Sequence, residues 1–268
     1  MIQKTIKKSI IFNGYGLHKK KESYLILNPA PPNYGIKING LEINPITVTN
    51  TSGMTTIRHY SMIEHLMSSL YALNIDNLDI ILKGSEDIPI LDGCSRLFLK
   101  EILNVGIESL KYNKCSYSID KELIVKSNDS YIKYIPSDND YLEFSCLVDF
   151  PYIGKQEYTW KSNDFDDYYD NISNALTFFW DDQLEMVKSH GNAQGVTDCN
   201  TIILTDQNYK LYNNSEFAKH KLLDLIGDLA TLNIELKGKI IAYKPGHKIN
   251  NMFARKIQEI LFEDDKFY

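Results

Sequence analysis

The chain has 268 residues, of which 43% are hydrophobic and 24% charged, a composition typical of a soluble globular protein with a sizeable core. Its formal net charge of −6 argues against a general nucleic-acid or anionic-membrane binder. No apolar run approaches the roughly 20 residues that span a bilayer, and the N-terminal segment lacks the long apolar stretch and cleavage site of a secretion signal.

The first half of the chain predicts strands followed by two helices. Segments 9–18 and 22–38 are typical of strands that are interrupted by glycine and proline. Residues 62–73 carry apolar side chains at helical spacing, and the next strand is expected over 75–84. Segment 87–107 predicts a turn and then a second helix.

The polar, tyrosine-rich segment 111–122 predicts a linker, after which a similar order begins again. The expected elements are two strands, a strand end with a helix, a strand, a helix, a strand that runs into a loop, and a closing helix, over residues 122–136, 141–150, 173–191, 200–205, 220–232, 236–247 and 250–264. We therefore predict an α+β fold with two domains, 1–115 and 116–268, packed helix layer against helix layer.

The four cysteines are scattered along the chain and form no CxxC pair, at Cys94, Cys115, Cys146 and Cys199. This spacing indicates neither a disulfide framework nor a cysteine zinc knuckle. We expect reduced, mostly buried thiols in a cytoplasmic protein.

Polar groups interrupt the apolar helical pattern of HKLLDLIGDL, residues 220–229. His220 and Asp224 are four residues apart and share a helix face, which makes them a workable pair of Zn²⁺ ligands. Asp228 lies one turn further on and could orient another group, while Lys221 could border the same cavity. For an isolated HxxxD pattern, a hydrogen-bonded buried histidine with capping or surface acids is the commoner interpretation.

A third metal ligand must come from another segment. His65 follows Glu64 on a predicted helix with apolar flanks. His65 as metal ligand and Glu64 as general base would parallel the roles of such residues in other zinc hydrolases. The alternative is that the two side chains form a pair on the helix surface. No HExxH motif is present, so a thermolysin-type protease is not indicated. His247 follows Pro245 and Gly246 in an expected loop, where it could be catalytic or simply exposed.

Several motifs lie along nearly the whole chain in one order: GYGLH (14–18), NPAPPNYGI (28–36), IEHLMSSLYALNIDNL (63–78), IPILDG (88–93), LTF (176–178), HKLLDLIGDL (220–229) and YKPGHKINN (243–251). GYGLH alone is an incomplete dinucleotide fingerprint and does not support a Rossmann fold. Together the motifs resemble the UDP-3-O-acyl-N-acetylglucosamine deacetylases, the zinc amidases of early lipid A biosynthesis.

The resemblance implies a catalytic Zn²⁺ site formed by His65, His220 and Asp224, with an open position for water. Fe²⁺ suits the same ligand set. Glu64 would take a proton from the water that attacks the N-acetyl carbonyl. Thr177 would stabilise the oxyanion that forms.

The resemblance also implies that Asp228 orients His247 and holds it as a cation, which donates a proton to the leaving amine. The implied fold is two βα domains that form a β-α-α-β sandwich, each with a small insert and with the active site between them. The second insert, about 179–206, would wall an apolar passage for the acyl chain.

The implied substrate is a UDP-linked acylated amino sugar. Lys221 and Lys244 would face its pyrophosphate and sugar. Asp149 and Phe150 would receive the nucleotide, with Phe150 stacked on uracil, and His18 would line the same region. We expect a monomer that associates transiently with the inner membrane and binds no nucleic acid.

The chain departs from the family pattern at a few positions. The first insert is short, and Cys94 follows LDG where a serine is usual. Leu176 stands in place of an arginine, and Phe179 and Trp180 add bulk. We expect these changes to affect acyl-chain preference, inhibitor fit and rate more than reaction type.

Two alternatives stay open. The chain could be a catalytically weak binder of the nucleotide lipid, since its inserts diverge. It could also be a zinc amidase that acts on a different acetylated amino sugar.

Overall fold

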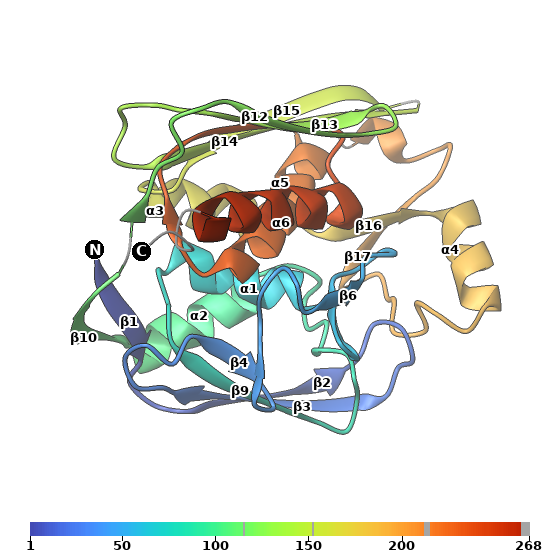
Figure 1. Ribbon diagram of the computed structural model, residues 1–268. Coiled ribbons are helices and arrows are strands. Elements are labelled where there is room, and N and C mark those ends of the chain that lie inside the picture. Colours follow the sequence, from blue (N-terminus) through green and yellow to red (C-terminus); the bar gives the residue numbers. More distant parts are fainter. Residues whose placement is uncertain (115, 152, 212–214, 264–268) are drawn as a thin grey trace.

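The computed structural model describes residues 1–114, 116–151, 153–211 and 215–263. Figure 1 shows a layered molecule in which helices lie between a lower and an upper sheet. The predicted α+β class and its sandwich of sheets around helices are confirmed.

The lower sheet comes from the first half of the chain (Figure 1). Its strands are β2 (Ile10–Tyr15), β3 (Glu22–Pro29), β4 (Ile36–Ile38), β5 (Leu41–Glu42) and β9 (Leu78–Lys83), in the order β2-β3-β9-β4-β5. Strand β9 is antiparallel to β3 and parallel to β4. Alternate side chains of β3, such as Leu25 and Leu27, are fully buried and face the helices.

The upper sheet repeats this arrangement with strands from the second half. Its strands are β12 (Leu123–Ser127), β13 (Ser130–Ile135), β14 (Leu142–Phe150), β15 (Gly154–Lys161) and β19 (Gly238–Tyr243), in the order β12-β13-β19-β14-β15. Strand β19 is antiparallel to β13 and parallel to β14. It therefore occupies the same place in this sheet as β9 does in the lower one. The division into domains 1–115 and 116–268 stays a prediction, and residue 115 lies outside the described ranges.

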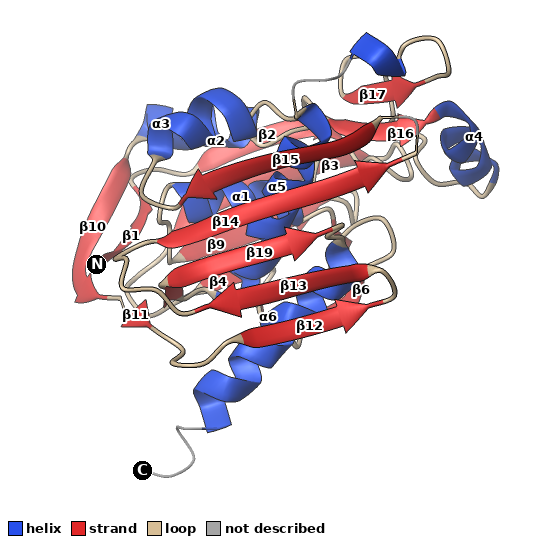
Figure 2. Ribbon diagram, turned by 90° about the horizontal axis from the view of Figure 1, so that it is seen from above, coloured by secondary structure: helices blue, strands red, loops and turns tan. Residues whose placement is uncertain are grey.

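The helices differ in how deeply they are buried. They are α1 (Glu64–Ala72), α2 (Arg96–Val105), α3 (Phe165–Asp167) with a following π-helix (Tyr168–Ile172), α4 (Asp181–Ser189), α5 (Glu216–Leu229) and α6 (His247–Glu263), with short 3-10 segments at Tyr209–Leu211 and Ala230–Leu232. Figure 2 shows α1 and α5 behind the upper sheet, whereas α4 projects from the body. Helices α1 and α5 are buried on nearly every face, as central helices of a sandwich must be.

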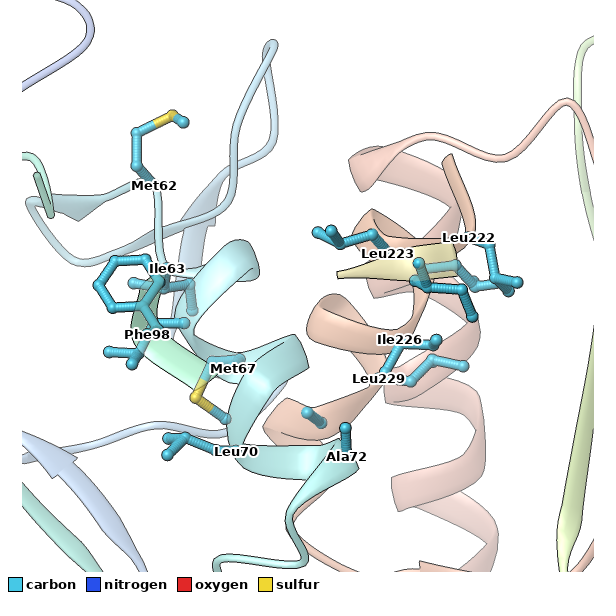
Figure 3. Close-up of a cluster of buried hydrophobic side chains, with 14 of the residues drawn as sticks. Met62, Ile63, Met67, Leu70, Ala72, Phe98, Leu222, Leu223, Ile226 and Leu229 are labelled. Carbon is cyan, nitrogen blue, oxygen red and sulfur yellow. The ribbon is translucent and has the colours of Figure 1, made fainter. Parts of the chain in front are cut away.

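The α1–α5 pair forms the centre of the core. Figure 3 shows the two helices side by side, with Met67 and Leu70 on the side of α1 that points away from α5. A Cβ atom at Gly227 would overlap the backbone oxygen of Glu64. The two helix backbones therefore cross at these residues more closely than any side chain at position 227 would permit.

The structure corrects the predicted position of His247. The sequence predicts a loop histidine and a closing helix from residue 250, but His247 is the first residue of α6. Pro245 and Gly246 lie between the end of β19 at Tyr243 and the helix, and the backbone N–H of Asn250 already donates to the Gly246 oxygen at 3.0 Å. That hydrogen bond closes a helical turn around His247 and gives its side chain a rigid base.

The segment 111–122, predicted as a linker, is partly strand. It contains the end of β10 (Ile107–Asn113), which pairs with β1 (Ile2–Ile6), and all of β11 (Ser116–Tyr117), which pairs with β18 (Glu235–Leu236). These pairings join residues far apart in sequence, so local polarity gave no sign of them.

Two inserts extend from the layers. The first is a three-stranded sheet of β6 (Val48–Asn50), β7 (Thr56–Ile57) and β8 (Tyr60–Ser61). In the second insert, β16 (Thr177–Trp180) pairs in parallel with β17 (Thr201–Leu204), and α4 connects the two strands in the sequence.

The described cysteines are all free thiols, buried at Cys94 and Cys146 and exposed at Cys199, while Cys115 lies outside the described residues. Within the described ranges, we find no helix with the length and apolar character needed to cross a membrane.

Candidate metal centre and active site

Three buried side chains meet where α1 crosses α5. His65 comes from α1, and His220 and Asp224 come from α5, with one ligand atom of each within 4.8 Å of the others. Asp224 Oδ1 lies 3.7 Å from His65 Nε2 and 3.6 Å from His220 Nε2. Two imidazoles and a carboxylate around one point are the donor set of a catalytic zinc site with an open position.

The protonation of this cluster also suits a cation. The Nδ1–H of His220 donates to the Ala175 carbonyl at 3.1 Å, which leaves the Nε2 lone pair directed at Asp224. Burial lowers the pKa of His220 to about 3, so the ring is neutral, as a metal ligand must be. Burial alone would raise the pKa of Asp224, but the Lys221 ammonium, 2.8 Å from Oδ2, helps to hold it well below its usual range.

An acid and a base flank the cluster. His247 Nε2 lies 4.0 Å from Glu64 Oε1 and 3.9 Å from Asp224 Oδ2. On the other side of the ring, its Nδ1–H donates to Asp228 Oδ2 at 2.9 Å. Burial alone would lower the pKa of His247, but the Asp228 carboxylate raises it to about 9, so the ring is a cation at neutral pH. Burial raises the pKa of Glu64.

Lys221 borders the same centre, as its place beside the His220–Asp224 stripe predicts. Its Nζ donates to Asp224 Oδ2 at 2.8 Å and lies 5.5 Å from the centroid of the Phe178 ring. The ammonium therefore faces both the candidate metal cluster and an aromatic side chain of the second insert.

Thr177 is connected to the cluster through its neighbours. It begins β16, two residues after Ala175, whose carbonyl accepts the His220 hydrogen bond. Its backbone N–H donates to the Gly93 oxygen at 3.0 Å. Its role in catalysis stays a prediction.

Lys244 and His247 line one cavity of about 360 Å³. Lys244 Nζ pairs with the exposed Asp129 carboxylate at 2.8 Å. Lys248 lines the same cavity, so two ammonium groups border it. This charge suits an anionic ligand next to His247.

Asp149 and Phe150 end strand β14 and are half-buried. The Phe150 ring contacts Phe178 edge-on, with centroids 5.4 Å apart, and lies 6.1 Å from Phe217. Phe150 thus belongs to the aromatic wall that also faces Lys221. Binding of a nucleotide at these positions stays a prediction.

His18 lies in a different cavity from Lys244. This second cavity, of about 290 Å³, is lined by His18, Lys19 and Lys21, and it shares no described lining residue with the first. The His18 ring is buried, and neither of its nitrogens has a hydrogen-bond partner among the described residues. Burial lowers its pKa, so the ring is neutral.

Two residues of the centre were not predicted. Asn250 donates to Asp228 Oδ2 at 2.8 Å, and the GHKINN motif was the available signal for it. Thr55 donates to Glu64 through its backbone and to Asp228 through its hydroxyl. No local pattern marks Thr55, because its contact with Asp228 spans 173 positions.

A family model for UDP-3-O-acyl N-acetylglycosamine deacetylases matches residues 3–259, which include every residue of this centre. The chain belongs to this family. The resemblance predicted from the motifs is thereby confirmed.

Three relatives illustrate how far the similarity extends, each named UDP-3-O-acyl-N-acetylglucosamine deacetylase. The protein of Colwellia psychrerythraea is 34% identical, over 98% of this chain and 94% of its own length. That of Wolinella succinogenes is 33% identical over 100% and 93%. That of Nautilia profundicola is 34% identical over 96% and 92%. The family membership therefore holds along the whole molecule.

Proposed function

We propose that the chain hydrolyses the N-acetyl group of UDP-3-O-acyl-N-acetylglucosamine and releases acetate, as a step of lipid A biosynthesis. The observation that carries the proposal is the pair Glu64 and His247, a buried acid and a cationic histidine 4.0 Å apart beside a candidate metal cluster. The names of the relatives supply the substrate.

The residues of the cluster fit a divalent metal. His65, His220 and Asp224 would hold Zn²⁺, or Fe²⁺, which accepts the same ligands. The ion would polarise the amide carbonyl and make water easier to deprotonate. The His220–Ala175 hydrogen bond would keep the ligand ring in the tautomer that binds.

Glu64 would act as general base. Its raised pKa brings the carboxylate closer to the working pH, where proton transfer is most effective. It would take the proton of the attacking water. His247, held as a cation by Asp228, would give its proton to the amine as the amide bond breaks. Thr177 would donate a hydrogen bond to the oxyanion.

Binding groups would surround this centre. Lys221 and Lys244 would face the sugar and pyrophosphate, Asp149 and Phe150 the nucleotide, and His18 another part of the substrate. The second insert, about 179–206, with Phe179 and Trp180 half-buried in β16, would border the acyl chain. We propose a cytoplasmic monomer that meets its lipid substrate at the inner membrane.

Acetate release from the acylated UDP-sugar by purified, zinc-supplemented protein tests the proposal. We expect one bound metal ion per chain and turnover that Glu64→Gln lowers by about 100- to 10,000-fold, with substrate binding retained. Folded, metal-loaded protein that releases no acetate would refute the function and favour a binder.

Unacylated UDP-N-acetylglucosamine is the discriminating control. We expect it to be turned over poorly, because it has no chain for the second insert to hold. Equal turnover of both compounds would instead favour an amidase for a different acetylated amino sugar.

A further inference from the structure

Thr55 of the first insert lies behind the proposed general base. It precedes β7 directly, and only 1% of its surface is exposed. Its backbone N–H donates to Glu64 Oε2 at 3.1 Å, and its hydroxyl donates to Asp228 Oδ1. One residue thus holds two carboxylates that come from different helices, α1 and α5.

These bonds close a ring of four residues. Asp228 Oδ1 accepts from Thr55, and Asp228 Oδ2 accepts from His247. His247 Nε2 faces Glu64 Oε1 at 4.0 Å, and Glu64 Oε2 accepts from Thr55. The gap between Glu64 and His247 is the only step of this ring, among the described atoms, that no hydrogen bond closes.

The Thr55 hydroxyl also decides how Asp228 is turned. Oδ2 already accepts from His247 and from Asn250 at 2.8 Å, so the Thr55 hydroxyl is the partner described for Oδ1. When a buried carboxylate oxygen loses its hydrogen-bond donor, the folded state bears the full free-energy cost of desolvating that oxygen. Without this hydroxyl, the carboxylate would turn toward other donors and take His247 with it.

We propose that Thr55 is a positioning residue, which sets the separation of Glu64 and His247 by holding one carboxylate with its backbone and the other with its hydroxyl. This inference rests on the proposed function. Thr55 acts through these partners and need not touch the substrate itself.

The kinetic consequence is specific. The groups proposed to bind the sugar, pyrophosphate and nucleotide, Lys221, Lys244 and Phe150, lie outside the ring. Thr55→Val keeps the branched shape and the backbone N–H but removes the hydroxyl. We expect kcat to fall by about 10- to 100-fold, as for other residues that orient a reacting group, with KM and metal content unchanged.

Matched variants separate the hydroxyl from the packing. Thr55→Ser restores the O–H and should recover kcat to within about threefold, although it loses the methyl group. Thr56→Val is the neighbouring control, because the buried Thr56 hydroxyl contacts Ser61 Oγ at 3.3 Å instead of a carboxylate. This variant should keep the wild-type kcat.

Turnover is measured per bound metal ion, and Thr55→Ala replaces Thr55→Val if the latter does not fold. A wild-type kcat in the hydroxyl-free variant would overturn the proposal, as would a Thr55→Ser variant that is equally slow, or a loss confined to KM. If the wild type itself releases no acetate, the proposed function fails. If the wild type is active and the hydroxyl-free variants are equally active, only the role of Thr55 fails.

Discussion

The charge of His247 depends on its partners more than on its own basicity. Burial would make the ring neutral, but the Asp228 carboxylate at 2.9 Å holds a proton on it. A neutral histidine could not give a proton to the leaving amine from Nε2, and it would carry no positive charge to stabilise the negative charge that develops before that step. In the proposed mechanism, Asp228 would therefore contribute to catalysis although it is not one of the candidate metal ligands.

The pH profile of the wild type should be bell-shaped. Glu64 must be ionised, so kcat/KM should rise as pH increases through its raised pKa. His247 must be protonated, so kcat/KM should fall as pH increases through about 9. A profile that is flat from pH 5 to 9 would contradict the assigned pair.

Asp228→Asn tests which limb belongs to His247. The amide cannot stabilise the imidazolium by charge, so the basic limb should move to lower pH by more than the acidic limb, which the burial of Glu64 chiefly sets. Measuring kcat/KM across pH for both proteins checks this. A basic limb that does not move would assign it to another group.

At the scale of elements, the crossing of α1 and α5 determines the site. Gly227 lets the α5 backbone approach Glu64, and this brings His220 and Asp224 of α5 to His65 of α1. The candidate ligands are thus positioned by helix packing, since most of the residues around them are apolar and buried.

Gly227→Ala should separate the two helices. Its Cβ would overlap backbone rather than a flexible side chain, so we expect a loss of about 1–3 kcal/mol in the free energy of unfolding, together with weaker metal binding. Urea unfolding and metal titration measure both effects.

Gly246→Ala is the control for this change, because a Cβ there meets no atom within 4 Å. It should unfold at the same urea concentration as the wild type. Equal stability of Gly227→Ala would show that the helices can give way at the crossing.

The elements were predictable to different degrees. Apolar spacing alone predicted α1 and α5, because burial on a helix leaves a local period. The start of α6 at His247 was missed, because Pro245 and Gly246 are typical of a loop. The meeting of His65 with His220 needed the resemblance, since spacing within one helix says nothing about another. Thr55 was missed for the same reason.

At the scale of the whole molecule, the metal should join the two halves of the sandwich. His65 belongs to the first half and the other two ligands to the second. An ion that binds only the folded chain adds stability, about 2.7 kcal/mol at 100 times its Kd. We expect chelation to lower the melting temperature and added Zn²⁺ to restore it.

A His220→Ala variant provides the comparison. Because it lacks a ligand, its melting temperature should respond little to chelator or Zn²⁺. A response as large as that of the wild type would indicate that the ion binds elsewhere.

The ring of Thr55, Glu64, Asp228 and His247 also bears on synthesis of the protein. The hydrogen bond between Thr55 and Asp228 spans 173 positions, and contacts of such high sequence separation are slow to form because a long loop must close first. A nascent chain would therefore carry Glu64, the proposed general base, before its partners in the ring have docked against it. Because the proposed centre combines residues of α1, α5 and α6, we expect acetate release only from chains in which these helices have docked, so that activity would report completed folding.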